Sequence, residues 1–390
     1  MEVSHKIIPK EHKNILKFKI TFVNFRVISW LNQDMKSKVY FIDFKTSFQR
    51  NIFDKLSDVA TKSNFYNFFE QYDKLAIKLH FGEYGNFGAV NPRFICFFVD
   101  KIKEQGGMPF IADTNTLYAG HRCNSIDHLN LAIRHGFTPG VINAPLIIAD
   151  GLLGQNEVQV EINQELTKIA YIASDIYHSE AILAVSHFTG HIETGFGAAI
   201  KNIGMGCASR KGKMEMHSNT IPKIRLEMCT GCGKCIKWCQ VEAISIVNEK
   251  AYIDVNKCTG CSQCISVCPF KAIGINWNAG SENLSEKIVN YVYAVSLNKK
   301  GKMFFINFLN NITALCDCTP MHGERIIPDI GILFSDDIVA IDRASVDLVD
   351  EKAGKDLFKN LYPKTDWRKQ LQYAERLGLG NQKYELIKIQ

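Results

Sequence analysis

The sequence lacks the features that would place it in a membrane or on nucleic acid. No uninterrupted apolar stretch approaches the ~18 residues that are needed to span a bilayer. The formal net charge is only +6 over 390 residues, and no dense stripe of lysine and arginine argues for nucleic-acid binding. With 46% apolar and 22% charged residues, the composition is ordinary for a soluble globular protein. The length then predicts two or three domains.

Acidic residues are missing from a long stretch near the N-terminus. Between His12 and Gln33 there is none, whereas several basic residues fall there. The segment lacks the arginine and serine richness of a transit peptide, and charges interrupt the apolar run that a secretory signal needs. We therefore expect residues 1–34 to be a poorly ordered extension, with Met35 as the true start. An organelle-targeting segment is the alternative.

A disulfide framework is also missing, although the chain has thirteen cysteines. Eight of them fall into two runs with the same spacing, C-x2-C-x2-C-x3-C, one from Cys229 to Cys239 and the other from Cys258 to Cys268. Structural zinc sites would instead use paired C-x2-C knuckles with a longer spacer. Disulfides would need an oxidising compartment, of which the sequence gives no sign. The cysteine usage therefore indicates a protein of a reducing, anaerobic compartment.

The spacing of the two runs is typical of bacterial two-cluster ferredoxins, in which the fourth cysteine of each run ligates the cluster of the other run. The sequence therefore predicts two [4Fe-4S] clusters as cofactors. The first ligand set is Cys229, Cys232, Cys235 and Cys268, and the second is Cys258, Cys261, Cys264 and Cys239. Pro269 follows the last cysteine of the second run, whereas Gln240 stands at the matching place in the first. We therefore expect either a looser turn after Cys239 or altered solvent access around it, with no ligand removed.

Periodicity outside the cysteine runs predicts an α/β fold. Short apolar runs alternate with longer amphipathic ones, which favours a mostly parallel sheet covered by helices. The cysteine runs belong to an inserted α+β module of bacterial-ferredoxin type over residues 222–277, and the α/β body comprises residues 35–221 and 278–390. Strands are expected at residues 39–44, 75–79, 109–112, 146–149, 181–185, 303–308 and 338–341, a hairpin at 157–171, and helices at 92–105, 125–135, 285–297 and 345–378.

Polar side chains follow several of the predicted strands, where ligands bind in open α/β sheets. His80 ends one such strand, and His187 and His191 follow another. A glycine-rich stretch at residues 195–206 carries Lys201, and the backbone N–H groups at a helix start there would suit an anion. Any single histidine is more often a packed residue than a functional one. Together, these four residues predict a catalytic pocket for a substrate or cofactor.

A second cysteine pattern lies outside the two runs. Cys316 and Cys318 form a C-x-C motif, with His322 close by in the sequence. Such a motif can bind a metal, or it can present a thiolate to a substrate or a cluster. Two incidental thiols in a loop are an equal alternative, so the sequence leaves the role of the motif open.

Four segments carry a family resemblance: residues 78–83 (KLHFGE), 186–191 (SHFTGH), 199–207 (AIKNIGMGC) and 316–318 (CDC). With the two cysteine runs among them, they resemble the uncharacterised iron–sulfur centre proteins, domain-of-unknown-function family 362, from about Met35 to the C-terminus. The resemblance implies a cytoplasmic, prokaryotic-type protein with a two-cluster ferredoxin insert, but it implies no reaction. The lysine segment is also similar to nickel-pincer lactate racemases, from which no residue role is carried over.

The function that these patterns favour is an iron–sulfur redox protein, of oxidoreductase type if it is an enzyme. Its two clusters would relay single electrons to a pocket in the α/β body, in exchange with a redox partner protein or a small-molecule acceptor. One alternative is a dedicated electron-transfer partner that has no substrate of its own. The other is a metal-assisted isomerase in which the clusters only stabilise the fold.

Overall fold

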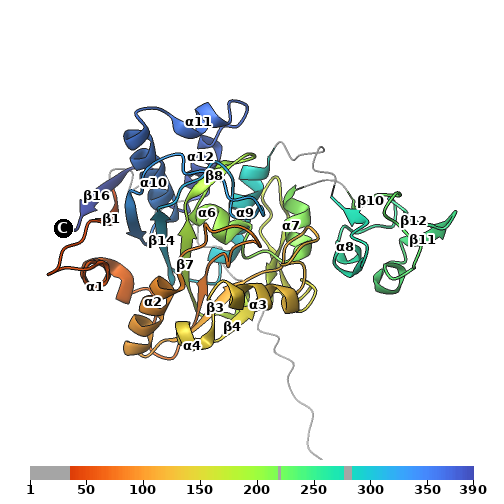
Figure 1. Ribbon diagram of the computed structural model, residues 1–390, viewed down its shortest axis with the longest axis horizontal. Helices are drawn as coiled ribbons and strands as arrows, with labels where there is room; N and C mark the ends of the chain where they lie inside the picture. The colour runs from red at the N-terminus through yellow and green to blue at the C-terminus, as the bar shows by residue number, and fades with distance from the viewer. Residues whose placement is uncertain (1–35, 218–220, 276–282) are drawn as a thin grey trace, which may run out of the picture. The chain divides into compact units, whose positions relative to one another are not determined.

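An eight-stranded sheet forms the centre of the α/β body in the computed structural model (Figure 1). The structure describes residues 36–217, 221–275 and 283–390, so the expected extension and the proposed start at Met35 lie outside the described residues. The strand order is β16-β1-β15-β14-β7-β2-β3-β4, and of these described strands only β15 runs against its neighbours. The prediction of a mostly parallel sheet is therefore confirmed. The strands are β1 (Ser37–Asp43), β2 (Lys74–Lys78), β3 (Met108–Asp113), β4 (Leu146–Ile148), β7 (Ala181–His187), β14 (Met303–Leu309), β15 (Gly331–Ser335) and β16 (Tyr384–Lys388).

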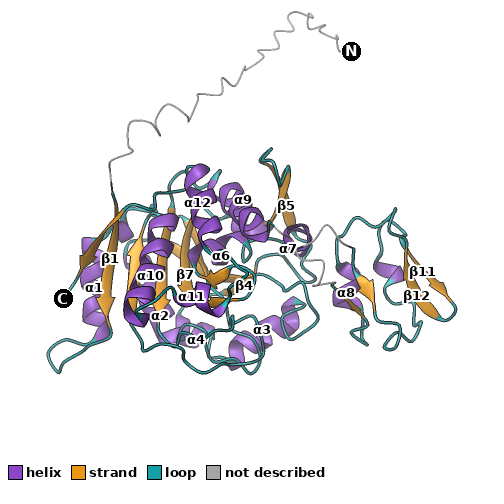
Figure 2. Ribbon diagram, turned by 90° about the horizontal axis from the view of Figure 1, so that it is seen from above, coloured by secondary structure: helices purple, strands orange, loops and turns teal. Residues whose placement is uncertain are grey.

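Strand β7 shows why helices cover both faces of the sheet. Its side chains alternate between two hydrophobic clusters, with Ile182 and Ala184 in one, and Leu183 and Val185 in the other. Because both faces of such strands are apolar, each face needs a layer of helices, which Figure 2 shows on either side of the strands. The first cluster includes residues of α6 (Ala199–Gly204), α9 (Leu284–Ser296), α10 (Ile338–Ala353) and α12 (Arg368–Arg376), and the second includes residues of α1 (Ile52–Lys62) and α2 (Pro92–Glu104).

One predicted strand, at residues 338–341, is wrong. These residues open helix α10, because the Asp337 carboxylate accepts the N–H groups of Val339 and Ala340 and so caps the helix start. A run of four apolar residues fits either a short strand or one turn of a buried helix, so periodicity alone could not separate them. The strand lies just before this point, at β15, and neither β15 nor β16 was predicted.

The remaining elements of the body decorate this sheet. The predicted hairpin forms between β5 and β6, whose residues pair in antiparallel register from Glu157 with Ala173 to Glu161 with Ile169. A second, short antiparallel pair, β8 and β9, directly follows β7 in the chain. These elements are β5 (Glu157–Glu161), β6 (Ile169–Ala173), β8 (Thr189–His191), β9 (Gly195–Gly197), α3 (Ser125–Arg134), α4 (Pro139–Ile142), α5 (Ser174–His178), α7 (Arg210–His217) and α11 (Leu357–Leu361), with a short 3-10 turn at Asn64–Tyr66.

The cysteine-rich segment, described over residues 221–275, has a small core of its own. Ile244, Ile253, Ile265 and Ile273 pack there together with three cysteines. Two short antiparallel pairs, β10 with β13 and β11 with β12, frame this core. Trp277, at the predicted end of the module, lies outside the described residues. The module contains β10 (Lys223–Ile224), β11 (Ile244–Val247), β12 (Lys250–Ile253), β13 (Ile273–Gly274), the 3-10 turn Ile236–Trp238 and α8 (Gln263–Val267).

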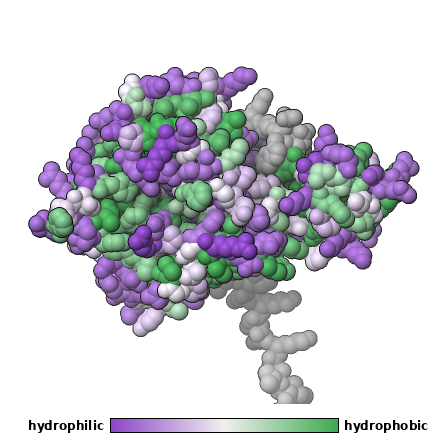
Figure 3. All heavy atoms as spheres, viewed as in Figure 1, coloured by the Kyte–Doolittle hydropathy of each residue, from purple (hydrophilic) through white to green (hydrophobic). Residues whose placement is uncertain are grey.

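The surface carries both hydrophilic and hydrophobic residues (Figure 3). Hydrophilic and hydrophobic residues are interspersed over the face drawn in Figure 3. Across the three described segments, no helix is both long and apolar enough to cross a membrane.

Candidate functional site

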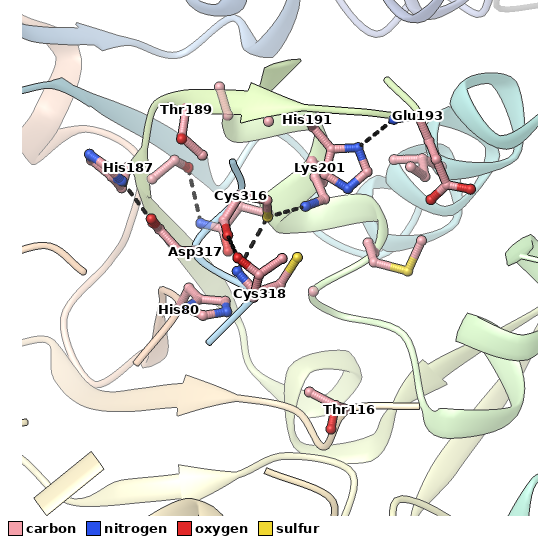
Figure 4. Close-up of a pocket in the computed structure, with 18 of the residues that line it drawn as sticks. His80, Thr116, His187, Thr189, His191, Glu193, Lys201, Cys316, Asp317 and Cys318 are labelled. Atoms are coloured by element: carbon pink, nitrogen blue, oxygen red, sulfur yellow. Dashed lines mark hydrogen bonds and ion pairs between the residues drawn. The ribbon is translucent and has the colours of Figure 1, made fainter. Parts of the chain in front are cut away.

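A cavity of about 510 Å³ lies beyond the carboxyl ends of β2, β3 and β7. This is the edge at which open α/β sheets bind ligands. All four residues predicted from the sequence, His80, His187, His191 and Lys201, line this cavity (Figure 4). The loop from Cys316 to Cys318 lines it as well, so the C-x-C motif is part of the same site.

The loop that carries the C-x-C motif is tied to the strands β7 and β8. Gly190 N–H donates to Thr313 O at 2.9 Å, and Thr189 Oγ1 donates to Leu315 O at 2.8 Å. Gly190 has to be glycine, because a Cβ atom there would collide with the carbonyl oxygen of Ala314. The sequence Thr189-Gly190 therefore serves to seat the loop against the sheet edge.

Both ring nitrogens of His187 are engaged in fixing this loop. Its Nδ1 lies 2.7 Å from Asp317 Oδ2, and its Nε2 donates a hydrogen bond to Asn310 O at 2.6 Å. Although burial works against it, the charge of Asp317 and its hydrogen bond raise the pKa of His187. In this arrangement, neither nitrogen is free to contact a ligand, so the geometry favours a positioning role for His187.

His80 is different, since only one of its ring nitrogens makes a hydrogen bond among the described residues. Its Nδ1 accepts the Gly82 N–H at 2.8 Å, which leaves the proton of the neutral ring on Nε2. Nε2 is buried and has no hydrogen-bond partner among the described residues. Burial, followed by the charge of Arg122, holds the pKa of His80 well below its usual range. His80 is thus a neutral hydrogen-bond donor at the cavity wall.

Lys201 and Cys316 form the closest charged contact in the cavity. Lys201 Nζ lies 2.8 Å from Cys316 Sγ, and the Cys318 N–H donates to the same sulfur at 3.3 Å. A hydrogen bond from the Cys318 thiol and the charge of Lys201 lower the pKa of Cys316 to about 6, against the effect of burial. Burial opposes the charged form of Lys201, but the two cysteines outweigh it and raise its pKa. Cys316 is therefore a thiolate paired with an ammonium group at neutral pH.

His191 completes this corner of the cavity. Its Nδ1 accepts the N–H groups of Glu193 at 3.3 Å and Thr194 at 3.2 Å. A ring nitrogen of His191 and the sulfurs of Cys316 and Cys318 all lie within 4.8 Å of one another. Burial and the charge of Lys201 hold the pKa of His191 well below its usual range, so the ring is neutral.

The helix start beside Lys201 does not offer an anion site. The N–H groups of Ala199 and Ile200, which open α6, donate to the Asp342 carboxylate at 3.0 and 2.9 Å. The anion expected there from the glycine-rich sequence is thus supplied by the protein itself, from α10. Burial raises the pKa of Asp342 to about 6, although these hydrogen bonds oppose the rise. Nothing in the local sequence around Asp342 indicates that this carboxylate is fully buried.

Three buried cations near the cavity, Lys78, Arg122 and Lys213, were assigned no role from the sequence, whereas Glu83 and Asp113 were noted as polar residues at strand ends. Lys78 pairs with Asp113 at 3.0 Å, and Arg122 pairs with Glu83 at 3.0 Å. Burial lowers the pKa of a third cation, Lys213, to about 8. The one available signal was Lys78, a charged residue inside an otherwise apolar strand. Lys78 and Arg122 are thus each paired with a carboxylate. Lys201 is instead paired with the sulfur of Cys316.

In the cysteine module, one predicted ligand set surrounds a single space. Cys229, Cys232, Cys235 and Cys268 line one small cavity, and no other cysteine lines it. Cys268 comes from the second run, so three cysteines of one run and the fourth cysteine of the other line this cavity. Cys258 belongs to the other set, and burial raises the pKa of its thiol, with further contributions from nearby Cys261 and Cys239.

The turns after the two fourth cysteines are the same despite the difference between Gln240 and Pro269. Ala243 N–H donates to Cys239 Sγ at 3.2 Å, and Ala272 N–H donates to Cys268 Sγ at 3.3 Å. The residues preceding these alanines both adopt positive φ, 50° and 52°. The looser turn expected after Cys239 is therefore not observed. The two turns also share a backbone hydrogen bond, from Glu242 N–H to Cys239 O and from Lys271 N–H to Cys268 O, both at 3.1 Å.

The spacing of these sulfurs fits a cofactor larger than one metal ion. Four thiolates around a single zinc ion would have to lie within about 4 Å of each other, given a Zn–S distance of about 2.3 Å. Among the described residues, the one group with three donor atoms within 4.8 Å is that of His191, Cys316 and Cys318. No three of the described module cysteines bring their sulfurs within 4.8 Å of one another. The donor set, all thiolate with backbone N–H groups directed at sulfur, is compatible with an iron–sulfur cofactor.

The chain is similar to a protein family and to a solved structure. The sequence profile of a family described as "Domain of unknown function (DUF362)" matches residues 75–347. No curated protein matches the chain. Among solved structures, the lactate racemase apoprotein from Thermoanaerobacterium thermosaccharolyticum is similar, with a TM-score of 0.40 and 12% identity, over 82% of this chain. The chain spans only 58% of the length of that protein.

Proposed function

Since the chain belongs to the DUF362 family, which has no assigned activity, its function has to come from its own residues, and we propose that it is an iron–sulfur redox protein. The eight module cysteines would hold two [4Fe-4S] clusters, and the cavity in the α/β body would bind the molecule that is oxidised or reduced. The observation that carries this proposal is the single space lined by Cys229, Cys232, Cys235 and Cys268.

When bound, such clusters would supply one-electron transfer. The protein contributes the thiolates and the backbone N–H groups that point at them. Ala251 N–H donates to Cys229 Sγ at 3.3 Å, in addition to the two equivalent contacts at Cys239 and Cys268. Hydrogen bonds to cluster sulfurs and limited solvent access are the means by which a protein sets the reduction potential.

In the cavity, the side chains would bind and orient a small molecule. A volume of about 510 Å³ is within the range of ligand pockets. His80 would donate a hydrogen bond from its unpartnered Nε2, and Lys201 would balance the charge of Cys316 and of the ligand. His187 would hold the loop through Asp317 and would not itself contact the ligand.

The partner in electron exchange would be a redox protein or a small-molecule acceptor. Several large apolar side chains are exposed on the module, which suits transient contact with another protein. They include Leu226, Trp238, Tyr252, Val255 and Phe270. The same observation favours a second candidate, in which the protein only transfers electrons and has no substrate. Substitution of His80 by Gln would then leave electron delivery intact, whereas the first proposal expects turnover to be lost.

The experiment that tests the proposal is anaerobic purification followed by iron and sulfide quantitation and EPR of the dithionite-reduced protein. We expect about eight irons per chain and a spin-coupled signal from two neighbouring reduced clusters. About four irons would mean that only one of the two ligand sets is functional and would overturn the two-cluster assignment. Zinc in place of iron would overturn the redox proposal as a whole.

A further inference from the structure

The C-x-C motif is a compact arrangement of two thiols inside the main cavity. Cys316 is buried, Cys318 is half-buried, and both line the cavity wall. Their sulfurs lie within 4.8 Å of each other, and the Cys318 N–H folds back onto Cys316 Sγ at 3.3 Å. Two thiols at this separation, reachable from one cavity, have the placement of an attacking and a resolving cysteine.

The third group of this corner, His191, argues against a bound metal ion here. Its Nδ1 accepts two backbone N–H groups, so the proton of the neutral ring is on Nε2. A histidine that ligates a metal usually has the opposite pattern, with its second ring nitrogen donating to an oxygen. In addition, the Lys201 ammonium group already lies against Cys316 Sγ, at 2.8 Å. The geometry therefore favours a reaction of the Cys316 and Cys318 thiols over metal binding.

We propose that Cys316 and Cys318 form a reversible dithiol–disulfide couple that reacts with small-molecule disulfides entering the cavity. Cys316 is the attacking thiol and Cys318 is the resolving thiol. This activity needs no cluster, so it stands or falls independently of the function proposed above.

The reaction consists of two successive thiol–disulfide exchange steps. The Cys316 thiolate attacks one sulfur of the disulfide RS–SR and expels RS⁻, which leaves Cys316 in a mixed disulfide. The Cys318 thiol gives its proton to the expelled RS⁻, and its sulfur attacks the sulfur of Cys316 and expels the second RS⁻. One S–S bond breaks and one forms overall. The two protein sulfurs are oxidised by two electrons, and RS–SR is reduced to RSH and RS⁻.

The charges and hydrogen bonds around the C-x-C motif favour Cys316 as the attacking thiol and Cys318 as the resolving thiol. The hydrogen bond from Cys318 and the nearby Lys201 ammonium favour the thiolate form of Cys316. The hydrogen bond to Cys316 and burial raise the pKa of Cys318 well above its usual range, so this thiol keeps its proton until the second step. An attacking thiol with a pKa near ambient pH reacts fastest, because both its thiolate fraction and its nucleophilicity are then substantial.

The sequence supplies a convenient assay for this chemistry. The tryptic peptide of residues 303–325 contains Cys316 and Cys318 and no other cysteine, and the peptide of residues 202–210 contains only Cys207. Cys207 is a matched internal control, because it is also buried but burial raises its pKa to about 11. The full-length reduced protein would be incubated anaerobically with bis(2-hydroxyethyl) disulfide, quenched with acid and analysed by mass spectrometry.

We expect peptide 303–325 to lose two hydrogen atoms, whereas the Cys207 peptide stays reduced. In Cys318→Ser, the mixed disulfide on Cys316 should accumulate instead, and in Cys316→Ser the peptide should remain unmodified. The wild-type result does not depend on how the variants fold. Equal reaction of Cys207, or a fully reduced peptide 303–325, would overturn the proposal. So would one equivalent of a metal that is retained by wild type, is lost in Cys316→Ser and blocks the reaction.

Discussion

The two cysteine-bearing regions of this protein bring their thiols together in different ways. In the module, three cysteines of one run, each separated from the next by two residues, surround one space together with Cys268 of the nearby second run. In the cavity, Cys316 meets its charge partner Lys201 across 115 residues of sequence. The first arrangement follows from local spacing and the second from the packing of the α/β body. The predictions below test whether the two regions are separable in this way.

The largest effect is expected from removing a module cysteine. Cys268→Ala should lower the iron content from about eight to about four per chain or less, because Cys268 completes the ligand set of the first run. Iron quantitation and the loss of spin coupling in EPR measure this effect. Cys318→Ala is the control from the other region and should retain all the iron. Full iron content in Cys268→Ala would contradict the exchange of fourth cysteines.

A large loss of stability is expected when the body loses a contact between distant segments. Asp342→Ala removes the acceptor for the N–H groups of Ala199 and Ile200 and for Asn307 Nδ2 at 2.8 Å. Because these donors are buried, the free energy of unfolding should fall by at least about 3 kcal/mol in denaturant titration.

Asp347→Ala, on the same helix, is the matched control. Its ion pair with Arg343 at 2.8 Å is partly exposed, so a change of no more than about 1 kcal/mol is expected. Similar losses in the two variants would show that the Asp342 contacts at the start of α6 are not specially stabilising.

The pH dependence of Cys316 alkylation tests the electrostatic pairing in the cavity. The thiolate is the reactive form, so the rate should rise with pH and be half-maximal near pH 6, where the pKa of Cys316 lies. In Lys201→Met, the midpoint should move up by about 1–3 pH units, because the thiolate loses its opposite charge.

Iodoacetamide labelling of peptide 303–325 measures both midpoints. Lys213→Met is the control, since Lys213 is a buried cavity lysine that donates instead to Thr114 Oγ1 and Ala208 O. Its midpoint should stay at that of the wild type. An unchanged midpoint in Lys201→Met would show that Lys201 does not activate Cys316.

The smallest effect is expected from exchanging the one residue that breaks the symmetry of the cysteine runs. Gln240→Pro should change stability by less than about 1 kcal/mol, because the turn after Cys239 already has the hydrogen bonds of its proline-containing counterpart. Thermal denaturation of this variant and of the reciprocal Pro269→Gln measures the effect. A large loss of stability in Gln240→Pro would mean that the two turns differ in a way that their hydrogen bonds do not reveal.

The candidate site was predictable where it depends on strand ends. His80 and His187 line one cavity because the parallel strands β2 and β7 bring their carboxyl ends to the same edge of the sheet. His191 and Lys201 line it from β8 and α6, which follow β7 in the chain. Their individual contacts were not predictable. His187 is fully engaged with Asp317 and Asn310, whereas His80 leaves one nitrogen unpartnered, and no local pattern separates these two cases.

The sequence was sufficient for the features that depend on short-range periodicity. It predicted the alternation of strands and helices, the mostly parallel sheet and the grouping of the module cysteines, because spacing along the chain controls each of these. It misassigned residues 338–341, since four apolar residues fit a buried strand as well as a helix turn.

The packing of the folded chain established which distant groups meet. It placed Asp342 at the start of α6, Lys78 beside Asp113, and Lys201 against Cys316. Such pairs form because burial in the body leaves a charged or polar group with few possible partners, and an unpaired one would be costly. The identity of each partner depends on how segments 35 to 143 residues apart pack together, which no local pattern encodes.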